Sequence, residues 1–273
     1  MSKRHITLLT IDPQNDFCDP KGALFVTGAD QDMKRLAAMV RTNADKIDSF
    51  RITLDSHHLA HIAHPVVWQD ANGNHPAPFT MFGSADVKNG TWSPVNPAWR
   101  TRVISYLEAL EANGRYPFII WNPHCLIGSW GTAVVPELRD AIRESYETKL
   151  KPVDWVTKGS HYFTEHYSAV QADVPDPRDP STQINTRFVQ ALQAADDILI
   201  SGEALSHCVA NTIRDVAAQF GDEHVKKFVL LTDASSPVGD LPGSTMFKDM
   251  ADAFVKELTA KGMRLSTTTT FFA

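Results

Sequence analysis

Short, mostly apolar runs alternate along this chain with longer segments in which apolar residues recur every three or four positions. Runs of this length without polar interruption are typical of strands buried on both faces of a sheet. We predict strands at residues 6–11, 118–121, 198–201 and 228–231, with weaker candidates at 52–55 and 155–157.

The intervening periodic segments predict amphipathic helices. The clearest patterns span residues 36–47, 103–110 and 247–258. Strands that alternate with helices predict an α/β fold, in which a mostly parallel sheet is flanked by helices on both faces as a three-layer sandwich. Ligands of such folds bind at the carboxyl ends of the strands.

The chain has 273 residues, of which 43% are hydrophobic, which is enough for one large domain. The connection at about residues 60–115 is long and contains many Pro, Gly, Asn and Trp residues. We therefore expect a single domain over residues 1–273 with an insertion at about 60–115. The insertion could cap a site or form an oligomer contact, and a homo-oligomer stays open.

Charge, apolar run length and cysteine content indicate the kind of partner, the compartment and the redox state of the thiols. The formal net charge is −6 and no dense cluster of basic residues occurs, which argues against nucleic-acid or anionic-membrane partners and favours a small molecule. No apolar run is long enough for a signal peptide or a membrane span, so a cytoplasmic protein is expected. The three cysteines show no CxxC spacing, which predicts reduced thiols.

One cysteine stands where a nucleophile would be placed. The run at 198–201 is followed by Gly202 and then by a helical pattern, and Cys208 lies at the start of that helix. Unpaired N–H groups and the positive end of the helix dipole favour a thiolate there and can bind an oxyanion. An isolated cysteine is more often an ordinary buried thiol, so the rest of the chain must decide.

Three segments supply that context: residues 12–17 (DPQNDF) after the first run, Lys158-Gly159 in mid-chain, and residues 202–209 (GEALSHCV). Together and in this order they resemble the nicotinamidase/isochorismatase superfamily of cysteine hydrolases, and nicotinamidases in particular. The resemblance implies a catalytic set of Asp12 as general base, Lys158 as a fixed cation and Cys208 as nucleophile. It also implies an oxyanion hole formed by the N–H groups of Ala204 and Cys208, with a cis Glu203–Ala204 peptide bond.

A metal site is indicated near the second predicted strand. Asp55 and His57 are two residues apart on extended chain and so project to the same side, and His124 follows the next run. This set resembles the metal site of nicotinamidases, although Ser56 stands where those enzymes often carry an aromatic residue. The resemblance implies one divalent ion, zinc first and iron or manganese as alternatives.

Four residues match positions that surround the substrate ring in nicotinamidases, namely Phe17, Trp121, Tyr167 and His207. The resemblance therefore implies hydrolysis of nicotinamide to nicotinate and ammonia through a cysteine thioester, with the metal binding the pyridine nitrogen.

Three alternatives remain at this point. One is a metal-independent amide or N-carbamoyl hydrolase of the same superfamily with a non-pyridine substrate. An isochorismatase is less favoured because its vinyl-ether hydrolysis needs no cysteine nucleophile. The third is a non-catalytic binding module that keeps the fold.

Overall fold

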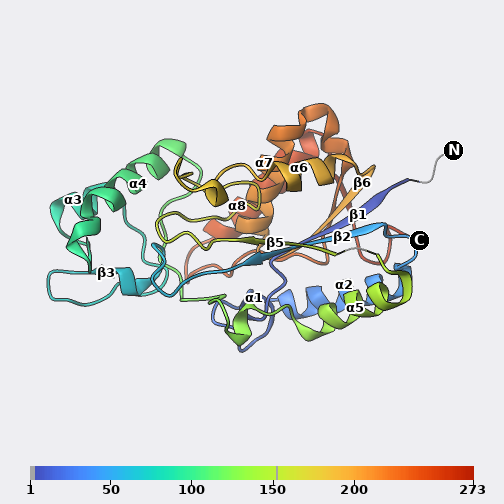
Figure 1. Cartoon of the computed structure of the whole chain (residues 1–273), viewed down its shortest axis with the longest axis horizontal. Coiled ribbons are helices and arrows are strands. Elements are labelled where there is room, and N and C mark those ends of the chain that lie inside the picture. The colour runs from blue at the N-terminus through green and yellow to red at the C-terminus, as the bar shows by residue number, and fades with distance from the viewer. Residues whose placement is uncertain (1–3, 152) are drawn as a thin grey trace.

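A six-stranded parallel sheet forms the centre of the computed structural model, which describes residues 4–151 and 153–273 (Figure 1). Its strand order is β5-β2-β1-β6-β7-β8, and a separate two-stranded sheet pairs β3 with β4. The strands are β1 (Ile6–Ile11), β2 (Ser49–Asp55), β3 (Trp68–Gln69), β4 (Ser93–Pro94), β5 (Val153–Lys158), β6 (Asp197–Gly202), β7 (Phe228–Leu231) and β8 (Arg264–Ser266).

Helices cover both faces of the central sheet, with α1, α2 and α5 on one side and α6, α7 and α8 on the other (Figure 1). The helices are α1 (Asn15–Cys18), α2 (Ala29–Asn43), α3 (Ser84–Asn89), α4 (Arg100–Asn113), α5 (Pro136–Lys149), α6 (Thr186–Gln193), α7 (Ala210–Phe220) and α8 (Met246–Ala260). The predicted three-layer α/β fold is confirmed. Across the described residues, no helix combines the length and the apolarity that crossing a membrane requires.

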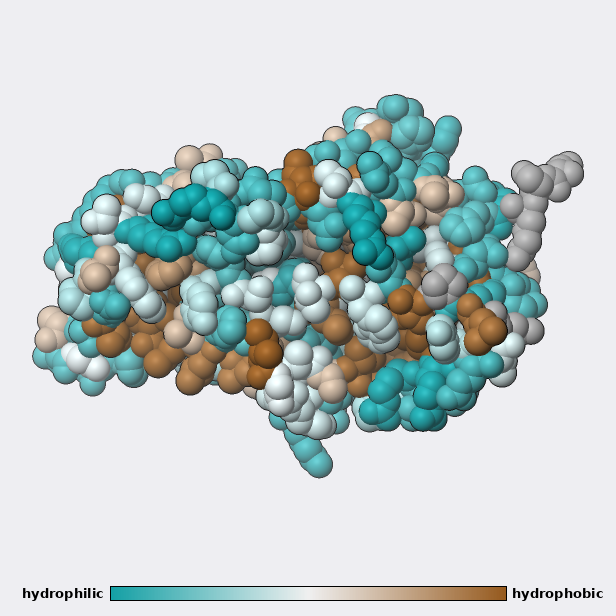
Figure 2. All heavy atoms as spheres, in the orientation of Figure 1, coloured by the Kyte–Doolittle hydropathy of each residue, from teal (hydrophilic) through white to brown (hydrophobic). Residues whose placement is uncertain are grey.

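The middle strands are buried on both faces because each lies between two helical layers. All six residues of β6 are buried, and so are the last five of β1. On the outer side of one layer, Figure 2 shows hydrophilic side chains gathered over α5. The burial of β1 and β6 on both faces agrees with the near-continuous apolar runs from which these strands were predicted.

One predicted strand is wrong. Residues 118–121 are buried as expected, but they do not join the central sheet. They run instead along two parts of the 60–115 region: Ile120 exchanges backbone hydrogen bonds with Phe79 and Thr80, and the Trp121 N–H donates to Ala63 O at 2.8 Å. An apolar run indicates that a segment is buried, but not which part of the fold buries it. Residues 118–121 pack against the 60–115 region and not within the central sheet.

Residues 60–115 contain β3, α3, β4 and α4, which extend to one end of the molecule (Figure 1). The edge strand β8 escaped prediction because it has only three residues, with a mixed polar sequence and two exposed positions. Short edge strands of this kind carry little hydrophobic pattern.

The first testable consequence concerns Gly202, where β6 ends. Its φ is +103°, and an added Cβ would overlap the backbone O and N of Ile11 on the neighbouring strand. Gly202→Ala should therefore lower the free energy of unfolding by about 3 kcal/mol or more, or prevent folding. Gly90→Ala is the matched control, because Gly90 has a φ of +88° and open space around it, and it should lose only about 1 kcal/mol in urea unfolding. Equal losses would show that β1 does not constrain the turn.

Candidate active site

Four neighbouring strands bring the predicted catalytic residues to one edge of the sheet. Asp12 directly follows β1, Asp55 ends β2, Lys158 ends β5 and Gly202 ends β6. In the strand register Asp55 stands opposite Lys158, and Ile11 opposite Gly202. The carboxyl edge of the sheet therefore sets these groups side by side, although they are up to 190 positions apart in the chain.

Lys158 is the centre of this cluster. Its Nζ lies 2.8 Å from Asp12 Oδ2 and 3.1 Å from Asp55 Oδ1. The same Nζ is 3.6 Å from Cys208 Sγ. The lysine and both carboxylates are buried, so one ammonium group joins two acids and the thiol in a region with little water.

The charges of the cluster follow from burial and pairing. Burial alone would lower the pKa of Lys158, but Asp12 and Asp55 hold it well above its usual value, so the ammonium stays charged. Burial raises the pKa of Asp12 despite the nearby ammonium. For Asp55, the neighbouring His57 and Lys158 outweigh burial and hold the pKa well below its usual value. The two carboxylates therefore differ, and Asp12 is the one better suited to hold a proton.

Cys208 lies in a π-helical turn, Leu205–Val209, which leads directly into α7. Helical structure thus begins earlier than the sequence pattern suggested. The Glu203–Ala204 peptide bond before the turn is cis, as predicted. The Ala204 carbonyl accepts hydrogen bonds from the His207 and Val209 N–H groups, while the Ala204 N–H makes none within the described parts of the chain.

The expected lowering of the Cys208 pKa is not what the structure gives. Burial raises the pKa of this thiol well above its usual value, and Lys158 opposes the rise only in part. The start of a helix favours the thiolate, but the buried Cys208 thiol has lost most of its contact with water. This loss raises the pKa by more than the helix start can lower it. A base is then needed to form the thiolate, and Asp12 contacts the same ammonium and lies next to the thiol.

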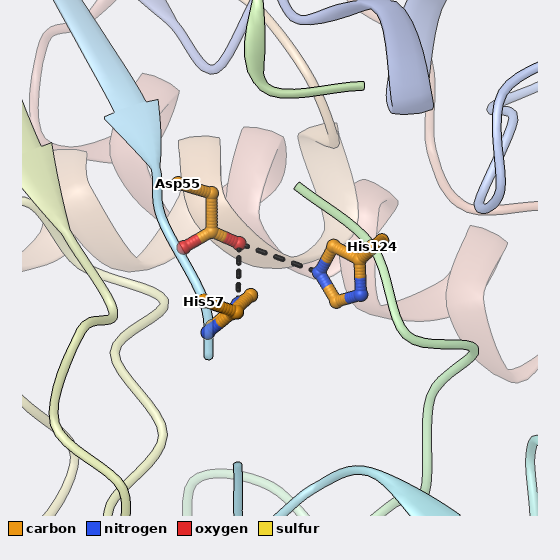
Figure 3. Close-up of side chains that lie close together, drawn as sticks. All are labelled: Asp55, His57 and His124. Atoms are coloured by element: carbon orange, nitrogen blue, oxygen red, sulfur yellow. Dashed lines mark hydrogen bonds and ion pairs between the residues drawn. The ribbon is translucent and has the colours of Figure 1, made fainter. Parts of the chain in front are cut away.

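Asp55, His57 and His124 come together as expected, and their candidate ligand atoms all lie within 4.8 Å of one another (Figure 3). Asp55 Oδ2 is 2.9 Å from His57 Nε2 and 3.4 Å from His124 Nε2. Each histidine Nδ1 faces a backbone carbonyl, Gly159 O at 2.9 Å and Asn122 O at 2.7 Å. These carbonyls hold a proton on Nδ1, so that Nε2 is the nitrogen that can give up its proton and bind a ligand, as in histidines that bind metals. The donor set fits a divalent ion.

A cavity of about 390 Å³, including its mouth, lies between the metal group and the thiol. The four residues matched to the substrate ring all line it, together with Asp55, His124, Ala204 and Cys208. The Trp121 Nε1–H donates to the Tyr167 hydroxyl at 2.9 Å, which fixes both rings. Burial lowers the pKa of His207 to about 3, so its ring is neutral. The cavity suits a flat, uncharged molecule.

Sequence reasoning missed three residues of this site. Gln14 forms two 2.7 Å hydrogen bonds with the backbone N–H and carbonyl of Asp55, and so fixes the position of that residue. The Thr53 hydroxyl donates to Asp12 Oδ1 at 2.5 Å. Glu165 lines the cavity, and burial raises the pKa of its carboxyl. Gln14 was part of the DPQNDF motif, whereas nothing local distinguishes Thr53 or Glu165.

No family model matches the chain. A nicotinamidase from Saccharomyces cerevisiae is 26% identical to it over 238 residues, which cover 86% of this chain and 90% of the relative. The crystal structure of yeast nicotinamidase Pnc1p bound to the inhibitor nicotinaldehyde has a TM-score of 0.63 at 21% identity, with 96% of this chain and 99% of that chain covered. Pyrazinamidase of Pyrococcus horikoshii in complex with zinc has a TM-score of 0.56 at 17% identity, covering 96% and 99%.

The three-layer fold, with an aspartate, a lysine and a cysteine at the carboxyl edge of its sheet, is the arrangement expected of the cysteine hydrolase superfamily predicted from the sequence. The chain resembles nicotinamidases over most of its length and shares their fold. The resemblance predicted from the sequence is thereby confirmed.

A second testable consequence concerns the buried ammonium. Lys158→Met keeps an unbranched side chain only one atom shorter but leaves Asp12 and Asp55 without their shared cation, and it should lower the free energy of unfolding by about 3–5 kcal/mol. It should also slow alkylation of Cys208 by iodoacetamide at fixed pH, because the charge that favours the thiolate is gone.

Lys34→Met is the control, since Lys34 makes an exposed ion pair with Asp30. Urea unfolding should show a loss below about 1 kcal/mol for this variant. Similar small losses for both variants, with unchanged alkylation, would contradict a central role for Lys158.

Proposed function

We propose that this protein is a cysteine-dependent amidohydrolase that converts nicotinamide to nicotinate and ammonia. The observation that carries the proposal is the contact of one buried ammonium, Lys158 Nζ, with Asp12 Oδ2 at 2.8 Å and Cys208 Sγ at 3.6 Å. This set opens into an aromatic cavity, and the similarity to nicotinamidases supports the same substrate.

In the first half of the reaction Asp12 takes the proton of the Cys208 thiol, and the sulfur attacks the carboxamide carbon. The raised pKa of Asp12 suits it to hold that proton. The N–H groups of Ala204 and Cys208 stabilise the negative oxygen of the tetrahedral intermediate. Asp12 then gives the proton to the nitrogen, the C–N bond breaks, and ammonia leaves a thioester on Cys208.

In the second half water attacks the thioester carbon while Asp12 accepts a proton from it. The C–S bond breaks, Asp12 returns its proton to Cys208, and the nicotinic acid formed loses its remaining proton to solvent or to ammonia to give nicotinate. Lys158 stays charged throughout, because its pKa is held well above its usual value by two carboxylates. It therefore limits the build-up of negative charge on Asp12 and Cys208 in each step.

We assign Asp55, His57 and His124 to one divalent ion, with zinc preferred and iron or manganese as alternatives. When bound, the ion would supply a Lewis-acidic anchor for the pyridine nitrogen of the substrate. Phe17 packs against His124 with ring centroids 5.2 Å apart, and Trp121 and Tyr167 each lie 5.3 Å from His207. These rings would hold a flat substrate with its carboxamide towards Cys208.

We also propose that residues 1–273 act as one domain, in which the region at about 60–115 is an insertion that closes one side of the site. Its first residues support this assignment, since His61 and His64 pack against the metal group and Ala63 holds Trp121.

The nucleophile is tested by Cys208→Ala, which should abolish ammonia release from nicotinamide because the thioester cannot form. Cys18→Ala and Cys125→Ala are matched controls, since both residues are also buried free thiols but lie outside the cavity lining, and they should keep most of the activity. Ammonia release from purified Cys208→Ala protein would contradict the mechanism.

The same assay on a small panel of amides separates the candidate substrates. Preference for nicotinamide supports the pyridine assignment. Equal or faster release from acyclic amides or N-carbamoyl compounds would favour the metal-independent hydrolase, and no turnover of any amide would favour a binding module.

The metal assignment predicts that His124→Ala, or chelation of the wild-type protein, weakens nicotinamide binding but leaves Cys208 reactive towards iodoacetamide. The physical reason is that the anchor contacts the ring and not the thiol. Metal analysis, KM and alkylation rate together check this outcome. If the protein carries no stoichiometric metal and added zinc, iron or manganese changes neither KM nor kcat, the assignment is wrong.

A further inference from the structure

His64 is a fully buried histidine beside the metal group for which the proposed mechanism has no use. Its ring lies edge-on to those of His57 and His124, with centroids 5.4 Å and 5.7 Å away. Two of the three proposed metal ligands therefore contact this one additional imidazole.

The hydrogen bonds of His64 define which ring nitrogen is bare. Its Nδ1 lies 3.1 Å from the Leu59 carbonyl oxygen, which can only accept, so Nδ1 carries the hydrogen. A neutral ring then presents an unprotonated lone pair at Nε2. Within residues 4–151 and 153–273 this Nε2 is buried and has no hydrogen-bond partner.

A buried acceptor without a partner is unfavourable, because it has lost its hydrogen bonds to water and gained none in return, so a site of this kind is expected to have an occupant. The neighbouring His61 makes the contrast clear. Its Nε2 lies 3.1 Å from Thr164 O, and its Nδ1 accepts from the Ala63 N–H at 3.3 Å, so both of its nitrogens are used within the protein. His64 alone of the two has a free acceptor beside the metal group.

We propose that His64 Nε2 accepts a hydrogen bond from a water molecule bound to the metal ion held by Asp55, His57 and His124. The inference rests on the metal assignment of the proposed function. His64 is outside the group whose ligand atoms lie within 4.8 Å of one another, which disfavours direct ligation. A bound water extends the reach of the ion by one hydrogen-bond length, about 2.8 Å.

The chemistry of both partners suits this contact. Three protein ligands leave coordination positions for water, and water on a divalent ion is a strong hydrogen-bond donor. His64 offers the complementary group, an acceptor whose orientation is fixed by Leu59 O. Contacts of this kind around a metal typically contribute 10- to 100-fold to its affinity, so His64 is a positioning residue for the ion and its water.

Two substitutions separate the two nitrogens of His64. His64→Asn keeps an amide N–H near the Nδ1 position for Leu59 O but removes the atom at Nε2, whereas His64→Gln keeps a polar atom near Nε2. Zinc and cobalt affinities of metal-free protein, measured by competition with a chelator, should fall about 10- to 100-fold in His64→Asn and much less in His64→Gln. His61→Gln is the control for loss of a buried histidine that packs against His57 but has no free nitrogen, and its affinity should fall much less than that of His64→Asn.

The cobalt absorption spectrum adds a readout that a general loss of stability would not move. The number of protein ligands should be the same in His64→Asn and wild type, because the contact runs through water. Wild-type affinity in His64→Asn, an equal loss in His61→Gln, or loss of one protein ligand from the spectrum would each overturn the proposal. Absence of ammonia release with the affinity pattern intact would contradict the proposed function and leave the role of His64 standing.

Discussion

The interaction on which the site depends is the burial of one lysine ammonium between two carboxylates. Lys158 is fixed by Asp12 and Asp55 at 2.8 and 3.1 Å, and it brings its charge to 3.6 Å from the Cys208 sulfur. Removing any one of the three charges would leave another buried without its partner, which is why Lys158, Asp12 and Asp55 act as a unit. Asp55 also faces His57 and His124, so the same ion pair couples the thiol to the metal group.

The parallel sheet makes this arrangement possible. Asp55 and Lys158 are opposite each other in the register of β2 and β5, and Ile11 and Gly202 are opposite each other on β1 and β6. Strands that all run in one direction deliver their carboxyl ends to one edge, and each end contributes one functional group. Gln14, which lies just after β1, forms hydrogen bonds with the backbone of Asp55. These bonds fix the residue whose carboxylate faces both the metal group and the Lys158 ammonium.

Much of this could be read from the sequence, because buried parallel strands leave continuous apolar runs and the functional residues follow them directly. The pattern failed at 118–121, where an apolar run is buried by the 60–115 region, yet His124 still reaches Asp55. The raised pKa of Cys208 was also out of reach, since it depends on how completely the folded chain excludes water. Glu165 and the free nitrogen of His64 depend on the tertiary packing of loops, which local periodicity does not encode.

The central claim is that Cys208 becomes acylated by the substrate. Its most direct test is rapid mixing of the protein with excess nicotinamide, acid quenching on the timescale of one turnover, and intact-mass analysis followed by peptide mapping. The account predicts a transient mass increase equal to one nicotinoyl group, located on Cys208 and absent from Cys208→Ala protein. Turnover of nicotinamide by a protein in which no acyl group ever appears on Cys208, or in which it appears on another residue, would contradict the account.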